Sequence, residues 1–321
     1  MFKRILVPLD ASPLAECVLP HAVAMATALD ASVTILHVCE PRPDQGDAPS
    51  VNAVGWRLKT LEAEGYLDGV ATRLREQGVQ VQSQRLEGRA AEQIISYARQ
   101  QGIDLIALSS HGRSGLSGWN VSGVVQKIIA RSRISTLVVR AYQPAISDLG
   151  GLAYSRLLCP LDGSQRAASV VPVAAALARA HGGEVLLAHV VRRPEMPRRW
   201  PLTEEEVQLI NRVAELNRLE AEQFLDGVRD ALLAEQVTAR SIVEVSETPS
   251  QSLHELVSKE NVDLVLMSAH GHTGSTRLPY GSLALNFVVY GTTPLLIAQD
   301  VPADQIGPSQ AEIAAGELMG R

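Results

Sequence analysis

Continuous apolar runs alternate with longer helical stretches along the whole chain. An apolar run without polar alternation is typical of a strand that is covered on both faces. In the first half, such runs predict strands at 4–9, 33–38, 79–85, 104–109 and 136–140. The stretches between them predict helices near 13–30, 56–77, 90–101 and 120–132.

The second half repeats this pattern. Its apolar runs predict strands near 156–161, 184–191, 239–245, 263–268 and 294–298, again with helices between them. Five strand–helix steps in each half predict an α/β fold with a five-stranded parallel sheet, right-handed crossovers and helices on both faces.

Short motifs show that the two halves are copies of one unit. The segment 5–12 returns as 157–164, an offset of 152 residues (157 − 5), and 104–112 returns as 263–271, an offset of 159 (263 − 104). This period is a whole domain and far exceeds a solenoid repeat. The larger second offset indicates a longer helix before about Glu235 in the second copy.

The repeat sets the expected domain organisation. We predict a first unit at 1–142, a linker at 143–154, a second unit at 155–300 and a polar tail at 301–321. At 321 residues, the length also favours two domains. Each unit is long enough to bury its own core.

A few individual residues predict where helices bend, begin or end. Pro20 and Pro172 occupy matched positions in the first helix of each unit, where a proline should bend the helix. Such a bend could shape a ligand wall or fit the helix to the sheet edge. Gly78 should end a helix, and Thr203 should cap the next one. The segment 40–53 is expected to be a mobile loop.

Composition excludes several classes of partner. The net charge of −6 offers no basic surface for a phosphate backbone, and 4% aromatic residues offer few stacking platforms for bases. No apolar stretch approaches the length of a membrane span. We therefore expect neither a nucleic acid nor a membrane as partner.

The cysteines and the first residues favour the cytoplasm. Cys17, Cys39 and Cys159 show no paired spacing, which suits a reducing compartment and buried, inert thiols. The first apolar run stops at Pro8 and Asp10, too soon for a signal segment.

Repeated residues cluster where a ligand should bind. In an open parallel sheet, ligands bind beyond the carboxyl ends of the strands, where the strand order reverses. The most closely repeated segments are 8–10 and 109–112 in the first unit, and 160–162 and 268–271 in the second. A loop rich in glycine and serine then leads to a helix. Backbone amides of such a loop and a helix N-terminus favour an anion such as phosphate.

On these residues, both halves resemble the universal stress protein domain, over about 1–141 and 155–299. Nucleotide-binding members of that family carry Gly-x-x-Gly-x9-Gly-(Ser/Thr) at this loop. The second unit reads Ser268-x-x-Gly271-x9-Gly281-Ser282, and the first reads Ser109-x-x-Gly112-x9-Ser122-Gly123. Serine thus replaces the first glycine in both units, and the final pair is inverted in the first.

The resemblance implies a tandem universal stress protein with two flavodoxin-like, adenine-nucleotide-hydrolase-like domains and an ATP-type ligand. The second unit is the better site, and its implied binding residues are Pro160, Asp162, Val190, Met267, Ser268, Gly271, Gly281 and Ser282. The equivalent residues of the first unit are Pro8, Asp10, Val38, Ser109, Gly112, Ser122 and Gly123.

The two aspartates allow more than one role. Asp10 and Asp162 could accept hydrogen bonds from ribose hydroxyls, reach a Mg²⁺ ion, or cap the first helix of each unit. The histidines His37 and His189 lie at strand ends and are interpreted as structural. The pair His270-x-His272 could suggest a metal site, but the first unit has Arg113 at the second position, which disfavours a metal.

No catalytic set is evident. The glycine loop lacks the lysine of a P-loop, and no Ser/His/Asp grouping is repeated. Three hypotheses stay open: an ATP-binding sensor of a cytoplasmic stress response, an interaction scaffold with degenerate pockets, and a slow ATP hydrolase. The last strands, 136–140 and 294–299, should pair the two units, and a further homodimer also stays open.

Overall fold

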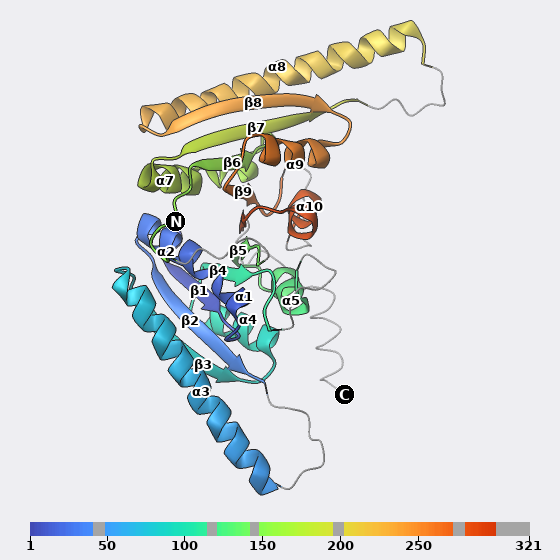
Figure 1. Ribbon diagram of the computed structural model, residues 1–321. Helices are drawn as coiled ribbons and strands as arrows, with labels where there is room; N and C mark the ends of the chain where they lie inside the picture. The colour runs from blue at the N-terminus through green and yellow to red at the C-terminus, as the bar shows by residue number, and fades with distance from the viewer. Residues whose placement is uncertain (41–48, 114–120, 142–147, 195–201, 272–279, 300–321) are drawn as a thin grey trace.

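The ten strands in the described part of the chain form one sheet between two layers of helices (Figure 1). The computed structural model describes residues 1–40, 49–113, 121–141, 148–194, 202–271 and 280–299. The α/β class and the parallel sheet of each unit are as predicted.

The first unit holds the first five strands. Its elements are β1 (Arg4–Pro8), α1 (Pro13–Glu16), α2 (Leu19–Leu29), β2 (Ser32–Cys39), α3 (Pro49–Glu76), β3 (Val81–Glu87), α4 (Ala90–Gln100), β4 (Leu105–Ser109), α5 (Gly123–Arg131) and β5 (Ser135–Val139). Strand order is β3-β2-β1-β4-β5, so the order reverses between β1 and β4.

The second unit repeats this arrangement. Its elements are β6 (Arg156–Pro160), α6 (Gln165–Ala168), α7 (Val171–His181), β7 (Glu184–Arg192), α8 (Glu204–Ala234), β8 (Thr238–Ser246), α9 (Pro249–Lys259), β9 (Leu264–Ser268), α10 (Ser282–Tyr290) and β10 (Leu295–Ala298). The order β8-β7-β6-β9-β10 places its reversal between β6 and β9.

The two units meet at β5 and β10, which run antiparallel. Leu296 faces Leu137 in this register, and Ile297 faces Thr136. All four residues are buried. Each face of the sheet carries a hydrophobic core that includes residues of both units. One core packs α2, α3, α7 and α8, and the other packs α4, α5, α9 and α10.

The prediction that Pro20 and Pro172 bend a helix is wrong. The segment predicted as one helix is two helices, and each proline lies in the first turn of the second one, α2 or α7. A first-turn amide has no intrahelical acceptor, so proline costs no hydrogen bond there. The break between the helices, rather than the proline ring, redirects the chain.

Other local predictions have mixed outcomes. Gly78 ends α3 with φ of 78°, and Thr203 caps α8 in a capping box with Glu206, both as predicted. The loop expected at 40–53 is too long, because α3 already begins at Pro49. The remainder of that loop, part of the linker and the tail at 301–321 lie outside the described residues.

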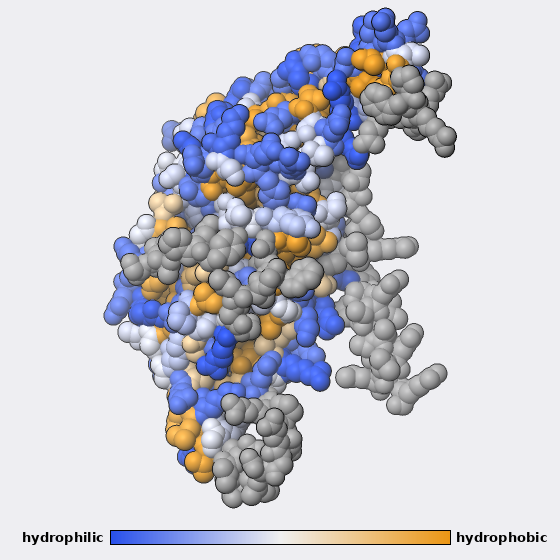
Figure 2. Space-filling model, turned by 45° about the vertical axis from the view of Figure 1, so that its right-hand side comes forward, coloured by the Kyte–Doolittle hydropathy of each residue, from blue (hydrophilic) through white to orange (hydrophobic). Residues whose placement is uncertain are grey.

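The surface is mainly hydrophilic, with hydrophobic residues interspersed, on the face drawn in Figure 2. Within the described parts of the chain, every helix is too short or too polar to cross a bilayer.

Candidate functional site

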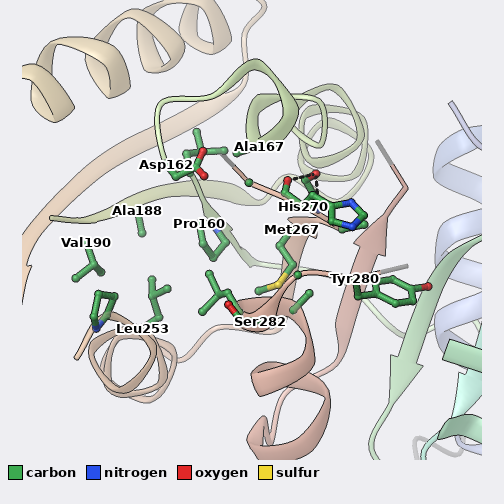
Figure 3. A pocket seen from close by; sticks show the side chains of 18 of the residues that line it. Pro160, Asp162, Ala167, Ala188, Val190, Leu253, Met267, His270, Tyr280 and Ser282 are labelled. Atoms are coloured by element: carbon green, nitrogen blue, oxygen red, sulfur yellow. Dashed lines mark hydrogen bonds between the residues drawn. The ribbon is translucent and has the colours of Figure 1, made fainter. Parts of the chain in front are cut away.

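A cavity of about 460 Å³ opens at the carboxyl ends of β6 and β9 (Figure 3). These strands are direct parallel neighbours, so Pro160 at the end of β6 and Ser268 at the end of β9 come together. The end of β7 and the first turns of α9 and α10 complete the wall. This is the point of strand-order reversal, where a ligand is expected.

All eight residues that the sequence singled out in the second unit line this cavity. They are Pro160, Asp162, Val190, Met267, Ser268, Gly271, Gly281 and Ser282. Sequence reasoning missed the contribution of α9, which supplies Pro249 and Leu253. Nothing in their local pattern distinguishes these two residues from ordinary helix residues.

Asp162 supports the turn into α6 but does not cap that helix. Its Oδ1 accepts hydrogen bonds from the Ser164 backbone N–H at 3.0 Å and the Ser164 hydroxyl at 2.6 Å. Ser164 is the N-cap, since its Oγ accepts from the Ala167 N–H at 3.1 Å. In the first unit, Ser12 caps α1 while Asp10 holds Ser12. The capping alternative for the two aspartates is therefore wrong.

The second glycine of each motif lies directly against this aspartate. A Cβ atom on Gly271 would overlap the Asp162 carboxylate, and one on Gly112 would overlap the carboxylate of Asp10. Real Cβ atoms do not approach oxygen so closely, so glycine is required while the aspartate keeps its position. The motif thus fixes the carboxylate at the edge of the cavity.

Ser268 uses its hydroxyl within the turn. Its Oγ donates to the His270 carbonyl at 2.7 Å and accepts from the His270 N–H at 3.3 Å. In the first unit, the Ser109 hydroxyl lies 2.7 Å from the carbonyls of both Leu14 and His111. The serines that replace the first glycine of the motif are buried parts of the scaffold.

The two units differ at the start of the helix that follows the glycine loop. In the first unit, the Ser122 hydroxyl accepts from the Val125 N–H at 3.4 Å and caps α5, which begins at Gly123. In the second unit, Gly281 holds the N-cap position and makes no side-chain cap. Its own N–H donates to the Ala269 carbonyl at 2.7 Å, so this amide is already used.

The order Gly281-Ser282 in the second unit, which is inverted in the first, therefore has a structural consequence. The first three N–H groups of α10, those of Ser282, Leu283 and Ala284, have no acceptor within the helix. These residues also line the cavity. The N-terminus of α10 thus presents its positive end where an anion could lie.

The two strand-end histidines differ as well. His37 Nδ1 lies 2.8 Å from the Leu9 carbonyl, as a structural histidine should. His189 lines the cavity, and its buried Nδ1 has no hydrogen-bond partner in the described part of the chain. The pKa of His189 is lowered from its usual value because burial disfavours the charged ring, and the nearby Asp162 carboxylate offsets only part of this effect. The structural reading therefore fits His37 only.

The remaining candidates of the first unit occupy the matching place. Pro8 ends β1 and Val38 lies near the end of β2. The Asp10 Oδ2 accepts a hydrogen bond from the Arg113 backbone N–H. The loop at 114–120 lies outside the described residues.

In the described part of the chain, neither metal ligands nor reactive thiols gather at this edge of the sheet. Within the described ranges, no group of three His, Cys, Asp or Glu side chains could hold a metal ion. The three cysteines are free, and burial raises the pKa of Cys159 to about 12.

Comparison with known proteins gives a consistent picture. The family model described as "Universal stress protein family" matches residues 1–140 and 153–299. Universal stress protein MJ0577 of Methanocaldococcus jannaschii is 30% identical over 155 residues, which cover 44% of this chain and 96% of that protein. Universal stress protein YxiE of Bacillus subtilis is 28% identical over 150 residues, with 44% and 100% covered. Each of these relatives corresponds in length to one unit.

A solved structure matches both units together. The crystal structure of a universal stress protein from Archaeoglobus fulgidus has a TM-score of 0.64 and 17% sequence identity. The match covers 93% of this chain and 98% of that one. At this identity, the likeness concerns the fold.

Proposed function

This chain belongs to the universal stress protein family, and we propose that its second unit binds an adenine nucleotide, with ATP as the expected ligand. Binding would make the protein a sensor or regulatory module of a cytoplasmic stress response. The observation that carries this proposal is that all eight binding residues expected in the second unit line one cavity, into which an uncapped helix N-terminus opens.

The size and lining of the cavity suit a nucleotide. Its volume of about 460 Å³ lies within the range of roughly 300–1,000 Å³ that is usual for small-molecule sites. Val190 and Leu253 form an apolar side that fits a base, with Asp162 at another edge (Figure 3). A carboxylate there can accept hydrogen bonds from ribose hydroxyls.

The phosphates would lie at the start of α10. The N–H groups of Ser282, Leu283 and Ala284, which have no acceptor within the helix, can donate to phosphate oxygens, and the helix dipole favours the negative charge of these oxygens. A Mg²⁺ ion would be held mainly by the phosphates and water, with the Asp162 carboxylate in the cavity lining as its protein ligand.

We propose that the first unit is the weaker or silent site. Ser122 already caps the equivalent helix through the Val125 N–H. The scaffold hypothesis therefore applies best to the first unit alone. Slow ATP hydrolysis has no specific residue in its favour, because neither unit has the Gly-Lys-(Ser/Thr) of a P-loop.

Isothermal titration with ATP tests the proposed function. We expect binding well below about 1 mM for the natural chain, and roughly tenfold weaker binding for Asp162→Ala. The matched control is Asp10→Ala in the first unit, which should leave the affinity unchanged. Absence of binding to a folded sample at about 1 mM ATP would overturn the proposal, and equal loss in both variants would overturn the assignment to the second unit.

We further propose that the two units pair within one chain in solution, as β5 and β10 do here. Light scattering should then give a mass of 34.5 kDa. A mass twice as large would show the additional homodimer.

A further inference from the structure

Helix α10 connects the cavity to the first unit. It has nine residues and is therefore about 13 Å long. Its first turn lines the cavity, whereas its last turn meets Arg140, which directly follows β5. The Arg140 guanidinium donates to the Phe287 carbonyl at 2.7 Å and the Val288 carbonyl at 3.1 Å. Arg140 has 0% of its surface exposed, so these bonds form away from water.

The other end of α10 is attached to the first unit as well. Tyr280, two residues before the helix, is 1% exposed and lines the cavity. Its hydroxyl points away from the cavity towards β5 (Figure 3). It lies 3.1 Å from Thr136 Oγ1 and donates to the Ile134 carbonyl at 3.0 Å. Both ends of α10 are thus bonded to residues at the two ends of β5.

The positions equivalent to Tyr280 and Arg140 carry different residues in the other unit. At the offset of 159, Val121 takes the place of Tyr280 (280 − 159), and Gln299 takes the place of Arg140 (140 + 159). An arginine also contacts the last turn of α5, but it comes from the same unit: Arg99 of α4 donates to the Arg131 carbonyl at 2.8 Å. Arg99 is exposed. The two residues that attach α10 to the first unit are therefore not repeated at the equivalent positions of the other unit.

Physical chemistry gives this attachment an effect on the cavity. A cation at a helix C-terminus is favourable, and hydrogen bonds from a charged donor are stronger than neutral ones. Loss of the guanidinium would leave buried carbonyl groups with fewer partners, which is costly. Such a loss would loosen α10, and the amides of its first turn would no longer be held ready for phosphate.

We propose that the first unit is a positioning element for the cavity of the second: Arg140 and Tyr280 fix the two ends of α10 against β5, so nucleotide affinity in the second unit depends on the docking of β5. This inference rests on the proposed nucleotide binding. Because coupling between two equilibria is reciprocal, nucleotide should in turn tighten the junction between the units.

Two measurements on the full-length chain test the proposal: titration with ATP, and hydrogen exchange of the α10 and β5 amides with and without ATP. Arg140→Gln introduces the residue that the other unit carries at this position. We expect its ATP affinity to fall roughly tenfold or more, and α10 to exchange faster even without ATP. In the natural chain, ATP should slow the exchange of β5 as well as α10.

Arg99→Gln is the matched control, because it makes the same chemical change at the end of α5. It should leave ATP affinity and α10 exchange as they are in the natural chain. Tyr280→Phe keeps the ring and removes only the hydroxyl; it should weaken binding severalfold. It also serves as the test if circular dichroism shows that Arg140→Gln does not fold.

The outcomes separate the two proposals. Natural chain that binds ATP, together with folded Arg140→Gln and Tyr280→Phe variants that bind it equally well, would overturn the positioning role and leave the proposed function intact. Natural chain that binds no ATP would overturn the proposed function. In that case α10 exchange without nucleotide decides the attachment alone: equal exchange in Arg140→Gln and Arg99→Gln would overturn it too.

Discussion

The carboxylate of Asp162 occupies the space that a side chain on Gly271 would need. The two residues come from the ends of adjacent strands, β6 and β9, and they meet where the strand order reverses. The glycine therefore serves the position of the aspartate as well as the approach of a ligand.

This relationship predicts the effect of Gly271→Ala. The added methyl group would displace the Asp162 carboxylate, so ATP affinity should fall by roughly the tenfold expected for loss of a hydrogen bond to a charged group. Titration calorimetry measures the change. Gly227→Ala in α8 is the control, because a Cβ there meets no atom within 4 Å. That control should keep the affinity and stabilise the helix by about 0.5–1 kcal/mol. Unchanged affinity in Gly271→Ala would contradict the role of the pair.

Ser122→Ala should affect stability without affecting ATP binding. The hydroxyl caps α5 through the Val125 N–H, and loss of such a cap costs about 1 kcal/mol. Urea denaturation would record the change in the free energy of unfolding. A loss of ATP affinity in this variant would instead place a functional site in the first unit.

Buried His21 predicts a loss of stability at acid pH. Its Nδ1 lies 2.8 Å from the Tyr154 hydroxyl, and burial lowers its pKa to about 4 from 6.5. The unfolded chain therefore binds a proton at a pH where the folded chain does not. Stability due to neutral His21 is complete above about pH 6.5 and is lost as pH falls towards 4.

Denaturation at several pH values checks this window. Between pH 7 and pH 4.5, the free energy of unfolding of the natural chain should fall more steeply than that of His21→Gln, which cannot be protonated. Parallel curves for the two proteins would show that another group causes the acid sensitivity.

The cysteines should resist thiol reagents in the folded chain. Cys39 and Cys159 are buried, and burial raises the pKa of both Cys159 and the half-buried Cys17. Only a thiolate reacts readily. A colorimetric thiol assay at pH 8 should detect little reaction before denaturation and all three groups after it. Fast reaction of one native thiol would contradict this expectation.

The sequence predicted the sheet well because buried parallel strands leave a direct signal. The inner strands, such as β4 and β9, are short apolar runs between polar segments, and the repeat supports each run through its copy. The motif residues were located for the same reason, since strand ends follow directly from the runs. The point where the strand order reverses, and hence the place of the cavity, follows from this topology rather than from any single residue.

Other features could not be predicted because the local pattern permits two answers. Asp10 and Ser12 are both good capping residues, and only the coordinates show that Ser12 caps α1. Pro20 suits both a bent helix and the first turn of a new one. The contact of Arg140 with Phe287 joins residues 147 positions apart, and no periodicity reports such a contact.

The antiparallel joint between β5 and β10 has a consequence for how the halves of this protein can change. In a symmetric homodimer the two subunits meet through identical surfaces, so a substitution appears in both subunits at once. Fusion of the two units in a single polypeptide removes that constraint. It also keeps the units together at any dilution, because the connecting segment sets their effective concentration. One unit can thereby lose its own ligand and specialise in supporting the other unit.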